Sequence, residues 1–302
     1  MLVSWQERFA ESQEVLRSEE RPQTVVPVLD FEIGGGEFIT MAGPCSVETE
    51  EQVMATAHHV RRHGARILRG GAFKPRTSPY AFQGLGLEGL KILARARQAT
   101  GLAIVTEVMS EEDLPMVAEY ADILQIGSRN MENYSLLAAA ARSGRPILLK
   151  RGLVATVADL LRSAAVVLSY GNPHVILCER GIRSFEPSMR NTFDAASLLL
   201  LKQISHLPVI ADPSHASGHA DQVPHLARVA VAAAADGMIV EVHPQPASAW
   251  SDGEQSLDFD AFTAMMNMLD PWIALRNLEL TQANSASRAC RHEELTALEA
   301  VR

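Results

Sequence analysis

Three cations lie close together in the segment LRGGAFKPRTSPYAFQGLG, residues 68–86. Arg69, Lys74 and Arg76 fall within eight positions, and two adjacent glycines follow Arg69. The whole chain of 302 residues is acidic, with a formal net charge of −9, so it lacks the excess of basic residues on which nucleic-acid binding depends. We therefore expect these cations to bind a small anion.

Four other residues carry side chains that ligate metals: Cys45, His215, Glu241 and Asp252. One sulfur, one nitrogen and two carboxylates suit a divalent transition metal, and manganese, iron, cobalt and zinc all remain candidates. Their spacing matches no compact zinc motif, so the fold must bring them together. Taken singly, Cys45 is more often a buried small hydrophobic residue, whereas His215 is as often a capping or core histidine as a ligand.

Short apolar runs rich in β-branched residues predict the elements that position these side chains. Eight such runs occur, at 38–45, 66–73, 102–108, 122–128, 146–152, 174–181, 207–215 and 236–243. Helical patterns with terminal Gly or Asn, such as VADLLRSAAVVLSYGN, separate them. Eight strand–helix units close a (β/α)8 barrel, also called a TIM barrel. The alternative, a doubly wound open sheet, more often has a Gly-rich turn where this chain has GPCSVE.

Such a barrel builds its active site at the carboxyl ends of its strands, where the candidate residues fall. Because the eighth strand closes against the first, the four metal-binding candidates can meet on one side of the mouth. Cations come from the second, fourth, fifth and sixth strands, as Arg69, Lys74, Arg76, Arg129, Lys150 and Arg180. Charges beside apolar strands must be paired or bind a ligand. Their number favours two anionic groups or substrates.

Several further residues have two interpretations each. Arg183 and Arg190 either pair with neighbouring carboxylates or contact a ligand. Glu107 is either a core carboxylate paired to a cation or a partner of a site residue, and His243 either orients a metal ligand or serves as one.

Residues at both ends lie outside the eight units, which we assign to a catalytic barrel over 38–272. Residues 1–37 are predicted to hold an amphipathic helix, SWQERFAESQEVLRSEE, and an apolar hairpin, TVVPVLDFEIGGG, at the barrel bottom. Residues 273–302 form a polar tail of weak helical character, for which an oligomer contact and poor order are both open. Neither end is expected to form a domain of its own.

The compartment is predicted from what the sequence lacks. No apolar run approaches the length needed to span a bilayer, and the start, MLVSWQERFAESQEV, does not have the pattern of a secretory signal. The cysteines, Cys45, Cys178 and Cys290, are too few and too far apart for a disulfide framework. We expect a cytoplasmic protein with neither membrane nor nucleic acid as a partner.

Seven motifs together resemble the type Iβ group of 3-deoxy-D-arabino-heptulosonate-7-phosphate (DAHP) synthases. They are GPCSVE, LRGGAFKPRTSPYAFQGLG, IGSRNMENYSLL, LLKRG, ILCERGIRSFE, LPVIADPSHASG and VEVHPQPASAWSDGEQSL, over roughly residues 32–270. The resemblance implies a (β/α)8 barrel that condenses phosphoenolpyruvate with erythrose 4-phosphate and water, the first step of the shikimate pathway.

The resemblance also implies a role for each candidate. The divalent metal would be held by Cys45, His215, Glu241 and Asp252, and phosphoenolpyruvate by Arg69, Lys74, Arg129, Lys150 and Arg180. Arg76, Thr77 and Ser78 would take the phosphate of erythrose 4-phosphate. Catalytic roles would fall to Lys74, Cys45 and His215, with Lys74 acting as an acid or stabilising charge near the aldehyde oxygen.

Two alternatives stay open: a 3-deoxy-octulosonate-8-phosphate synthase that uses arabinose 5-phosphate, and a catalytically silent barrel that serves as a binding or regulatory subunit. The resemblance implies a homodimer or homotetramer. We expect no feedback inhibition through a fused domain, although a separate chorismate mutase that binds the enzyme could supply regulation.

Overall fold

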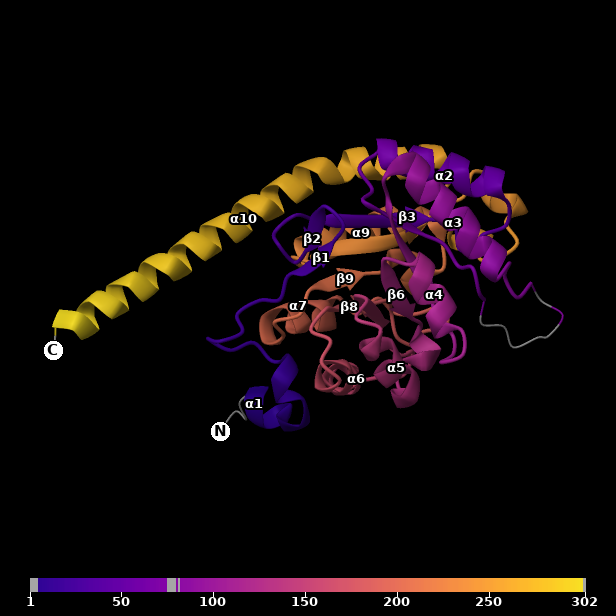
Figure 1. Ribbon diagram of the computed structural model, residues 1–302. Helices are drawn as coiled ribbons and strands as arrows, with labels where there is room; N and C mark the ends of the chain where they lie inside the picture. The colour runs from indigo at the N-terminus through magenta and orange to yellow at the C-terminus, as the bar shows by residue number, and fades with distance from the viewer. Residues whose placement is uncertain (1–4, 75–79, 81, 301–302) are drawn as a thin grey trace.

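The computed structural model describes the backbone of residues 5–74, 80 and 82–300 (Figure 1), and the side chains of these residues apart from Gln6 and 281–300. Three of the expected substrate-binding residues, Arg76, Thr77 and Ser78, lie outside the described residues.

Within the described residues, eight parallel strands form a closed barrel and follow one another around it in chain order. They are β3 (Ile39–Gly43), β4 (Ile67–Arg69), β5 (Ala103–Glu107), β6 (Ile123–Ile126), β7 (Ile147–Lys150), β8 (Val175–Glu179), β9 (Val209–Ala211) and β10 (Gly237–Glu241). β10 closes the barrel on β3, with Gly237 beside Ile39 and Glu241 beside Gly43. Each expected apolar run contains one of these strands, so the predicted (β/α)8 fold is confirmed.

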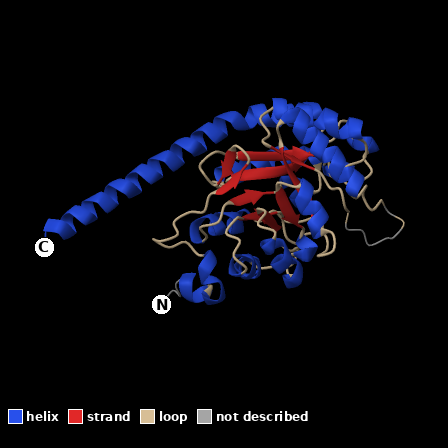
Figure 2. Ribbon diagram, viewed as in Figure 1, coloured by secondary structure: helices blue, strands red, loops and turns tan. Residues whose placement is uncertain are grey.

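Helices surround the strands on the outside of the barrel (Figure 2). They are α2 (Glu50–Arg62), α3 (Leu87–Thr100), α4 (Leu114–Tyr120), α5 (Tyr134–Arg142), α6 (Val157–Ser169), α7 (Ala195–Ile204), the short α8 (Pro213–Ser217), α9 (Val223–Ala232) and α10 (Phe259–Ala300). Local signals set several ends: Thr156 and Asp159 form a capping box on α6, and Gly101 ends α3 in the left-handed conformation at φ 70°.

Side chains alternate along the strands between two apolar clusters. Met41 and Ile67 belong to the cluster inside the barrel, whereas Ala42 and Leu68 belong to the cluster between strands and helices. Because both faces of each strand are buried, the strands appear in the sequence as continuous apolar runs.

A hairpin of β1 (Val26–Val28) and β2 (Phe31–Ile33) covers the amino-terminal end of the barrel. Its buried Val26 and Ile33 belong to the same cluster as the interior residue Ile39. The helix expected before it is shorter than its pattern suggested: α1 (Trp5–Arg8) is followed by a 3-10 segment, η1 (Ala10–Val15). Ser12 breaks the helical geometry there, and Leu16 bridges to Ser205 instead of continuing the helix.

The last described element is one long helix. α10 spans 42 residues from Phe259 to Ala300 and packs its first part on α9 and α2. Its later part extends away from the barrel, as the yellow ribbon in Figure 1 shows. Buried Arg276 fixes the point of departure, because its Nη1 donates to Gly36 O at 2.8 Å and its Nη2 lies 3.5 Å from Asp236 Oδ1.

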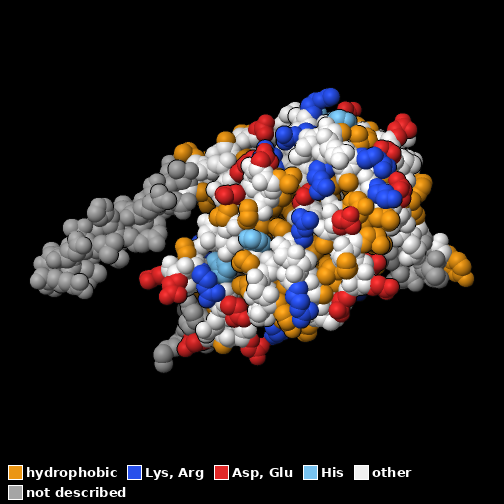
Figure 3. Space-filling model, in the orientation of Figure 1, with side chains coloured by type: hydrophobic (Ala, Val, Ile, Leu, Met, Phe, Trp, Pro, Cys, Tyr) orange, Lys and Arg blue, Asp and Glu red, His pale blue; other side chains and the backbone are white. Residues whose placement is uncertain are grey.

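The surface agrees with the acidic, mixed composition. On the face drawn in Figure 3, cations and carboxylates are interspersed over the barrel. No helix in the described part of the chain is both long enough and apolar enough to cross a membrane.

Candidate active site at the carboxyl end of the barrel

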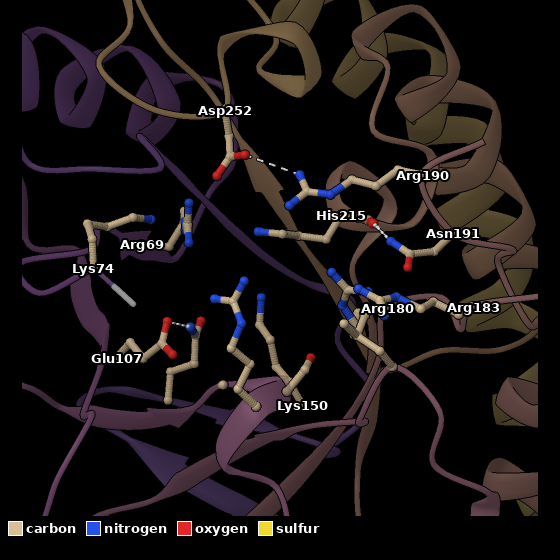
Figure 4. Close-up of a pocket in the computed structure, with 15 residues that line it drawn as sticks. Arg69, Lys74, Glu107, Lys150, Arg180, Arg183, Arg190, Asn191, His215 and Asp252 are labelled. Carbon is tan, nitrogen blue, oxygen red and sulfur yellow. Dashed lines mark hydrogen bonds and ion pairs between the residues drawn. The ribbon is translucent and has the colours of Figure 1, made fainter. Parts of the chain in front are cut away.

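A cavity of about 240 Å³ opens at the carboxyl ends of the strands (Figure 4). Of the described side chains that line it, two are carboxylates, Glu107 and Asp252, and seven are cations. The cations are Arg69, Lys74, Arg129, Lys150, Arg180, Arg183 and Arg190. Figure 4 shows the labelled cations among them converging on one space, with His215 pointing into it. Such an excess of positive charge in a concave site attracts anions.

Three possible metal ligands lie together on one side of the cavity. Cys45 follows β3, Glu241 ends β10, and Asp252 lies in the loop after β10. One ligand atom from each lies within 4.8 Å of the other two. Closure of β10 on β3 produces this grouping, because it brings together residues that are far apart in the sequence. Cys45 and Asp252 are separated by 207 positions, and the Cys45 thiol donates to Asp252 Oδ2 at 3.0 Å.

His215 adds a nitrogen at the edge of this group, with its Nε2 3.4 Å from Glu241 Oε1. On its other side, Nδ1 lies 2.8 Å from Asp212 Oδ2, and Asp212 Oδ1 accepts the backbone N–H of His215 at 3.0 Å. Asp212 therefore both caps α8 and fixes the orientation of the imidazole. Burial lowers the pKa of His215, which keeps the ring neutral near pH 7, the form that binds metals.

Cys45, His215, Glu241 and Asp252, hereafter the metal-donor group, together offer one sulfur, one nitrogen and two carboxylates. This donor set fits a divalent transition metal. Burial, followed by the charge of Glu241, raises the pKa of the Cys45 thiol to about 12. A metal that binds through this sulfur must therefore displace its proton.

Three cavity cations contact the metal-donor group directly. The contacts are Arg69 Nη1 to Glu241 Oε1 at 2.6 Å, Lys74 Nζ to Cys45 Sγ at 2.9 Å, and Arg190 Nη1 to Asp252 Oδ1 at 3.2 Å. Burial opposes ionisation of both carboxylates, yet the pKa values of both are lowered. The pKa of Glu241 is lowered by the charge of His215 when its ring is protonated and by that of Arg69, and the pKa of Asp252 by its hydrogen bond from Cys45 and by the charge of Arg190. The carboxylates are thus ionised and ready to bind a metal.

The opposite wall of the cavity carries Arg129, Lys150 and Arg180, from the ends of β6, β7 and β8. Lys150 Nζ lies 2.5 Å from Asp212 Oδ2. Arg180 differs from it, because it is 5% exposed and, among the described residues, pairs with no carboxylate. Its Nη1 donates to Gly181 O at 3.3 Å, and burial lowers its pKa. A buried cation without a counter-ion is poised to bind an anion.

The structure gives Arg183 and Arg190 surroundings that differ from the expected pairing with acids near them in the sequence. Arg190 pairs with Asp252, and Arg183 lines the cavity without an ion pair to any described carboxylate, so neither pairs with the acids near it in the sequence. Glu107 also lines the cavity, and it accepts from Gln125 Nε2 at 3.1 Å. A Cβ at Gly127 would lie 2.0 Å from Glu107 Oε1, so a larger residue there would displace this carboxylate.

Sequence reasoning missed the role of Arg151, the neighbour of Lys150. Arg151 is as buried as Lys150, but it pairs with Glu179 at 2.8 Å and Asp194 at 2.9 Å outside the cavity. Side chains alternate along a strand, so the two cations of LLKRG point to opposite faces. That alternation is the signal that separates the cavity-facing cation from the structural one.

Two polar residues beside the metal-donor group gave no signal in the sequence. Gln255 is 1% exposed and donates to Glu241 Oε2 at 2.6 Å, and Asn191 donates to His215 O at 2.7 Å. His243, which was a candidate, has Nε2 3.3 Å from Glu48 Oε2 and is buried beside that residue.

Comparison with known proteins places this geometry in a family. The family model for the DAHP synthetase I family matches residues 12–272. A phospho-2-dehydro-3-deoxyheptonate aldolase of Thermotoga maritima is 51% identical over 243 residues, which are 80% of this chain and 72% of the relative. A 2-dehydro-3-deoxyphosphooctonate aldolase of Acidithiobacillus ferrooxidans is 32% identical, over 77% of this chain and 88% of the relative.

Solved structures give the same result. The crystal structure of the phospho-2-dehydro-3-deoxyheptonate aldolase (DAHP synthase) of Thermotoga maritima superposes with a TM-score of 0.85 at 46% identity, covering 88% of this chain and 78% of that one. A truncated form of 3-deoxy-D-arabino-heptulosonate 7-phosphate synthase from the same organism gives 0.83 at 44% identity, covering 88% and 98%. The chain therefore belongs to the DAHP synthetase I family.

Proposed function

We propose that the chain condenses phosphoenolpyruvate with erythrose 4-phosphate and water, giving 3-deoxy-D-arabino-heptulosonate 7-phosphate and phosphate. The observation that carries this proposal is a cavity lined by seven cations with the metal-donor group at its edge, in a chain of this family. Two phosphorylated substrates account for the excess of positive charge. The higher identity to the heptonate aldolase than to the octonate aldolases favours the four-carbon aldose as acceptor.

The metal-donor group would hold the divalent ion, with Cys45, His215, Glu241 and Asp252 as ligands. Such an ion, whether manganese, iron, cobalt or zinc, supplies Lewis-acid polarisation of an aldehyde carbonyl. Asp212 holds His215 through Nδ1 and so presents Nε2 toward the ligand position.

Phosphoenolpyruvate would be held by Arg129, Lys150 and Arg180 on one wall and by Arg69 and Lys74 on the other. Guanidinium groups bind phosphate or carboxylate with two parallel hydrogen bonds, and Lys adds a compact charge. These cations offset the repulsion between two anionic substrates and hold C3 of phosphoenolpyruvate against the aldehyde carbon. A C–C bond then forms, water adds at C2, and C–O cleavage releases phosphate.

Lys74 is the proposed proton donor or charge stabiliser at the aldehyde oxygen. Its Nζ lies 2.9 Å from Cys45 Sγ and 3.1 Å from Cys45 O, which places it beside the metal-donor group. The assignment of Arg76, Thr77 and Ser78 to the phosphate of erythrose 4-phosphate rests on the resemblance of KPRTS alone.

The deciding experiment supplies phosphoenolpyruvate with erythrose 4-phosphate or with arabinose 5-phosphate and follows the loss of phosphoenolpyruvate absorbance. We expect turnover with erythrose 4-phosphate, loss of turnover after metal removal, and recovery when a divalent metal is restored. Turnover with arabinose 5-phosphate alone would identify an octulosonate synthase. No turnover with either, in folded and metal-loaded protein, would indicate a silent barrel.

The cellular setting is also part of the proposal. A cytoplasmic enzyme fits a biosynthetic family, and a homodimer or homotetramer fits the exposure of Trp272, Leu275 and Leu278 on α10. Light scattering on the purified chain measures the oligomeric state. Co-purification with chorismate mutase tests whether a separate regulatory partner binds.

A further inference from the structure

Gln255 is a buried amide next to the metal-donor group. It ends a 3-10 turn, Gly253–Gln255, that directly follows Asp252, and its side chain is 1% exposed. Its Nε2 donates to Glu241 Oε2 at 2.6 Å, while its Oε1 accepts from Arg190 Nη1. One side chain therefore contacts a metal-binding carboxylate with its donor and a cavity cation with its acceptor.

These two contacts help to hold the two carboxylates of the metal-donor group, Glu241 directly and Asp252 through Arg190. Glu241 Oε1 is held by Arg69 at 2.6 Å, so Gln255 supplies the partner of its other oxygen. Arg190 Nη1, held by Gln255, also contacts Asp252 Oδ1 at 3.2 Å. Loss of the amide would leave Glu241 Oε2 without this partner, so that Arg69 holds the carboxylate through Oε1, and would leave Arg190 without the contact that directs it toward Asp252.

The backbone around Gln255 is fixed independently of its side chain. Leu257, two positions later, donates its N–H to Glu241 O at 2.9 Å and accepts from His243 N at 2.9 Å. Ser256 Oγ donates to Asp252 O at 3.0 Å. Replacement of the amide should therefore leave this turn in place, so its effect can be separated from unfolding.

We infer that Gln255 is a positioning residue, which orients Glu241 as a metal ligand and holds the cavity cation Arg190 against Asp252. This inference rests on the proposed function. Replacement of a residue that hydrogen-bonds to a metal ligand commonly changes the metal affinity by about 10- to 100-fold.

The test measures Co²⁺ binding to metal-stripped protein, from the visible spectrum of the cobalt-bound thiolate and from the thermal midpoint with and without Co²⁺. Gln255→Leu removes both hydrogen bonds at similar volume, and Gln255→Asn keeps an amide but withdraws it. The matched control is Glu254→Gln, an exposed position on the same turn. We expect the Co²⁺ dissociation constant of both Gln255 variants to rise about tenfold or more, the Co²⁺-induced rise in thermal midpoint to shrink, and the control to match wild type.

If Gln255 has only a structural role, its replacement lowers the thermal midpoint of the metal-free protein but does not change the Co²⁺ dissociation constant. That result in a folded Gln255→Leu protein would overturn the inference. If Gln255→Leu does not fold, the same reading is taken from Gln255→Asn. If the wild-type protein itself does not bind Co²⁺, the proposed metal site is wrong and this inference fails with it. If the wild-type protein binds Co²⁺ and the Gln255 variants have the same dissociation constant, only the inference about Gln255 is overturned.

Discussion

Replacement of Arg180 by methionine should weaken phosphoenolpyruvate binding without destabilising the free protein. Arg180 is 5% exposed and pairs with no described carboxylate, and burial lowers its pKa. The free protein therefore bears the cost of a desolvated cation, and an apolar side chain of similar length removes that cost. The lost contact to the substrate is charge-assisted and contributes about 1.5–3 kcal/mol, which is roughly 10- to 100-fold in affinity.

Arg151→Met is the matched control, because Arg151 is buried to the same degree but is paired with Glu179 and Asp194. Its loss leaves the fully buried Glu179 without a counter-ion, which typically costs about 3–5 kcal/mol of unfolding free energy. Two neighbouring buried arginines should thus give opposite results. Only Arg151→Met should lower the stability of the ligand-free protein.

The assay is urea unfolding with and without phosphoenolpyruvate, combined with steady-state kinetics. A substrate concentration of about 100 times the dissociation constant stabilises wild type by about 2.7 kcal/mol. A dissociation constant raised 10- to 100-fold would reduce that gain to roughly 1.4–0.4 kcal/mol at the same concentration. The reasoning is refuted if Arg180→Met lowers the stability of the free protein while its gain from phosphoenolpyruvate remains that of wild type.

Three further predictions concern the metal, the two substrates and pH. Cys45→Ala should keep the fold but lose most activity and retain less metal, measured by metal analysis after dialysis; undiminished activity under chelation would contradict the metal assignment. Arg69→Ala should chiefly raise the KM for phosphoenolpyruvate and Arg76→Ala that for erythrose 4-phosphate, by roughly tenfold or more, and the partition is wrong if both raise only the same KM. His206 is buried between Glu14 O and the Thr24 hydroxyl, and burial lowers its pKa from 6.5, so protonation favours the unfolded state. The free energy of unfolding should therefore fall as pH drops below about 6.5, and His206→Gln should reduce that fall; an equal pH dependence in both proteins would rule out His206 as its source.

Most of the fold could be predicted because burial on both faces leaves a strong record in the sequence. Each of the eight strands lies in an apolar run, and the carboxyl-end rule then places Cys45, His215 and Glu241 at one mouth. The amino-terminal helix was less predictable, since the bridge from Leu16 to Ser205 is a tertiary contact that overrides local helical preference.

The finer structure of the site depended on contacts that no local pattern records. Arg69 and Lys74 were expected as anion-binding residues, and in the structure they also contact Glu241 and Cys45. Gln255 had no signal at all, because a polar residue in a loop is ordinarily exposed. Such roles arise only after closure of the barrel sets distances between residues far apart in the chain.

Closure of β10 on β3 also has a consequence for the order of events during folding. The proposed metal ligands come from both sides of that closure, so a chain that has assembled only some of its strands does not contain the site. Contacts between such distant residues carry a large loop-closure cost and form late. Metal uptake should therefore follow barrel closure. A bound ion would then link the first strand of the barrel, β3, to the last, β10, and so stabilise the closed barrel.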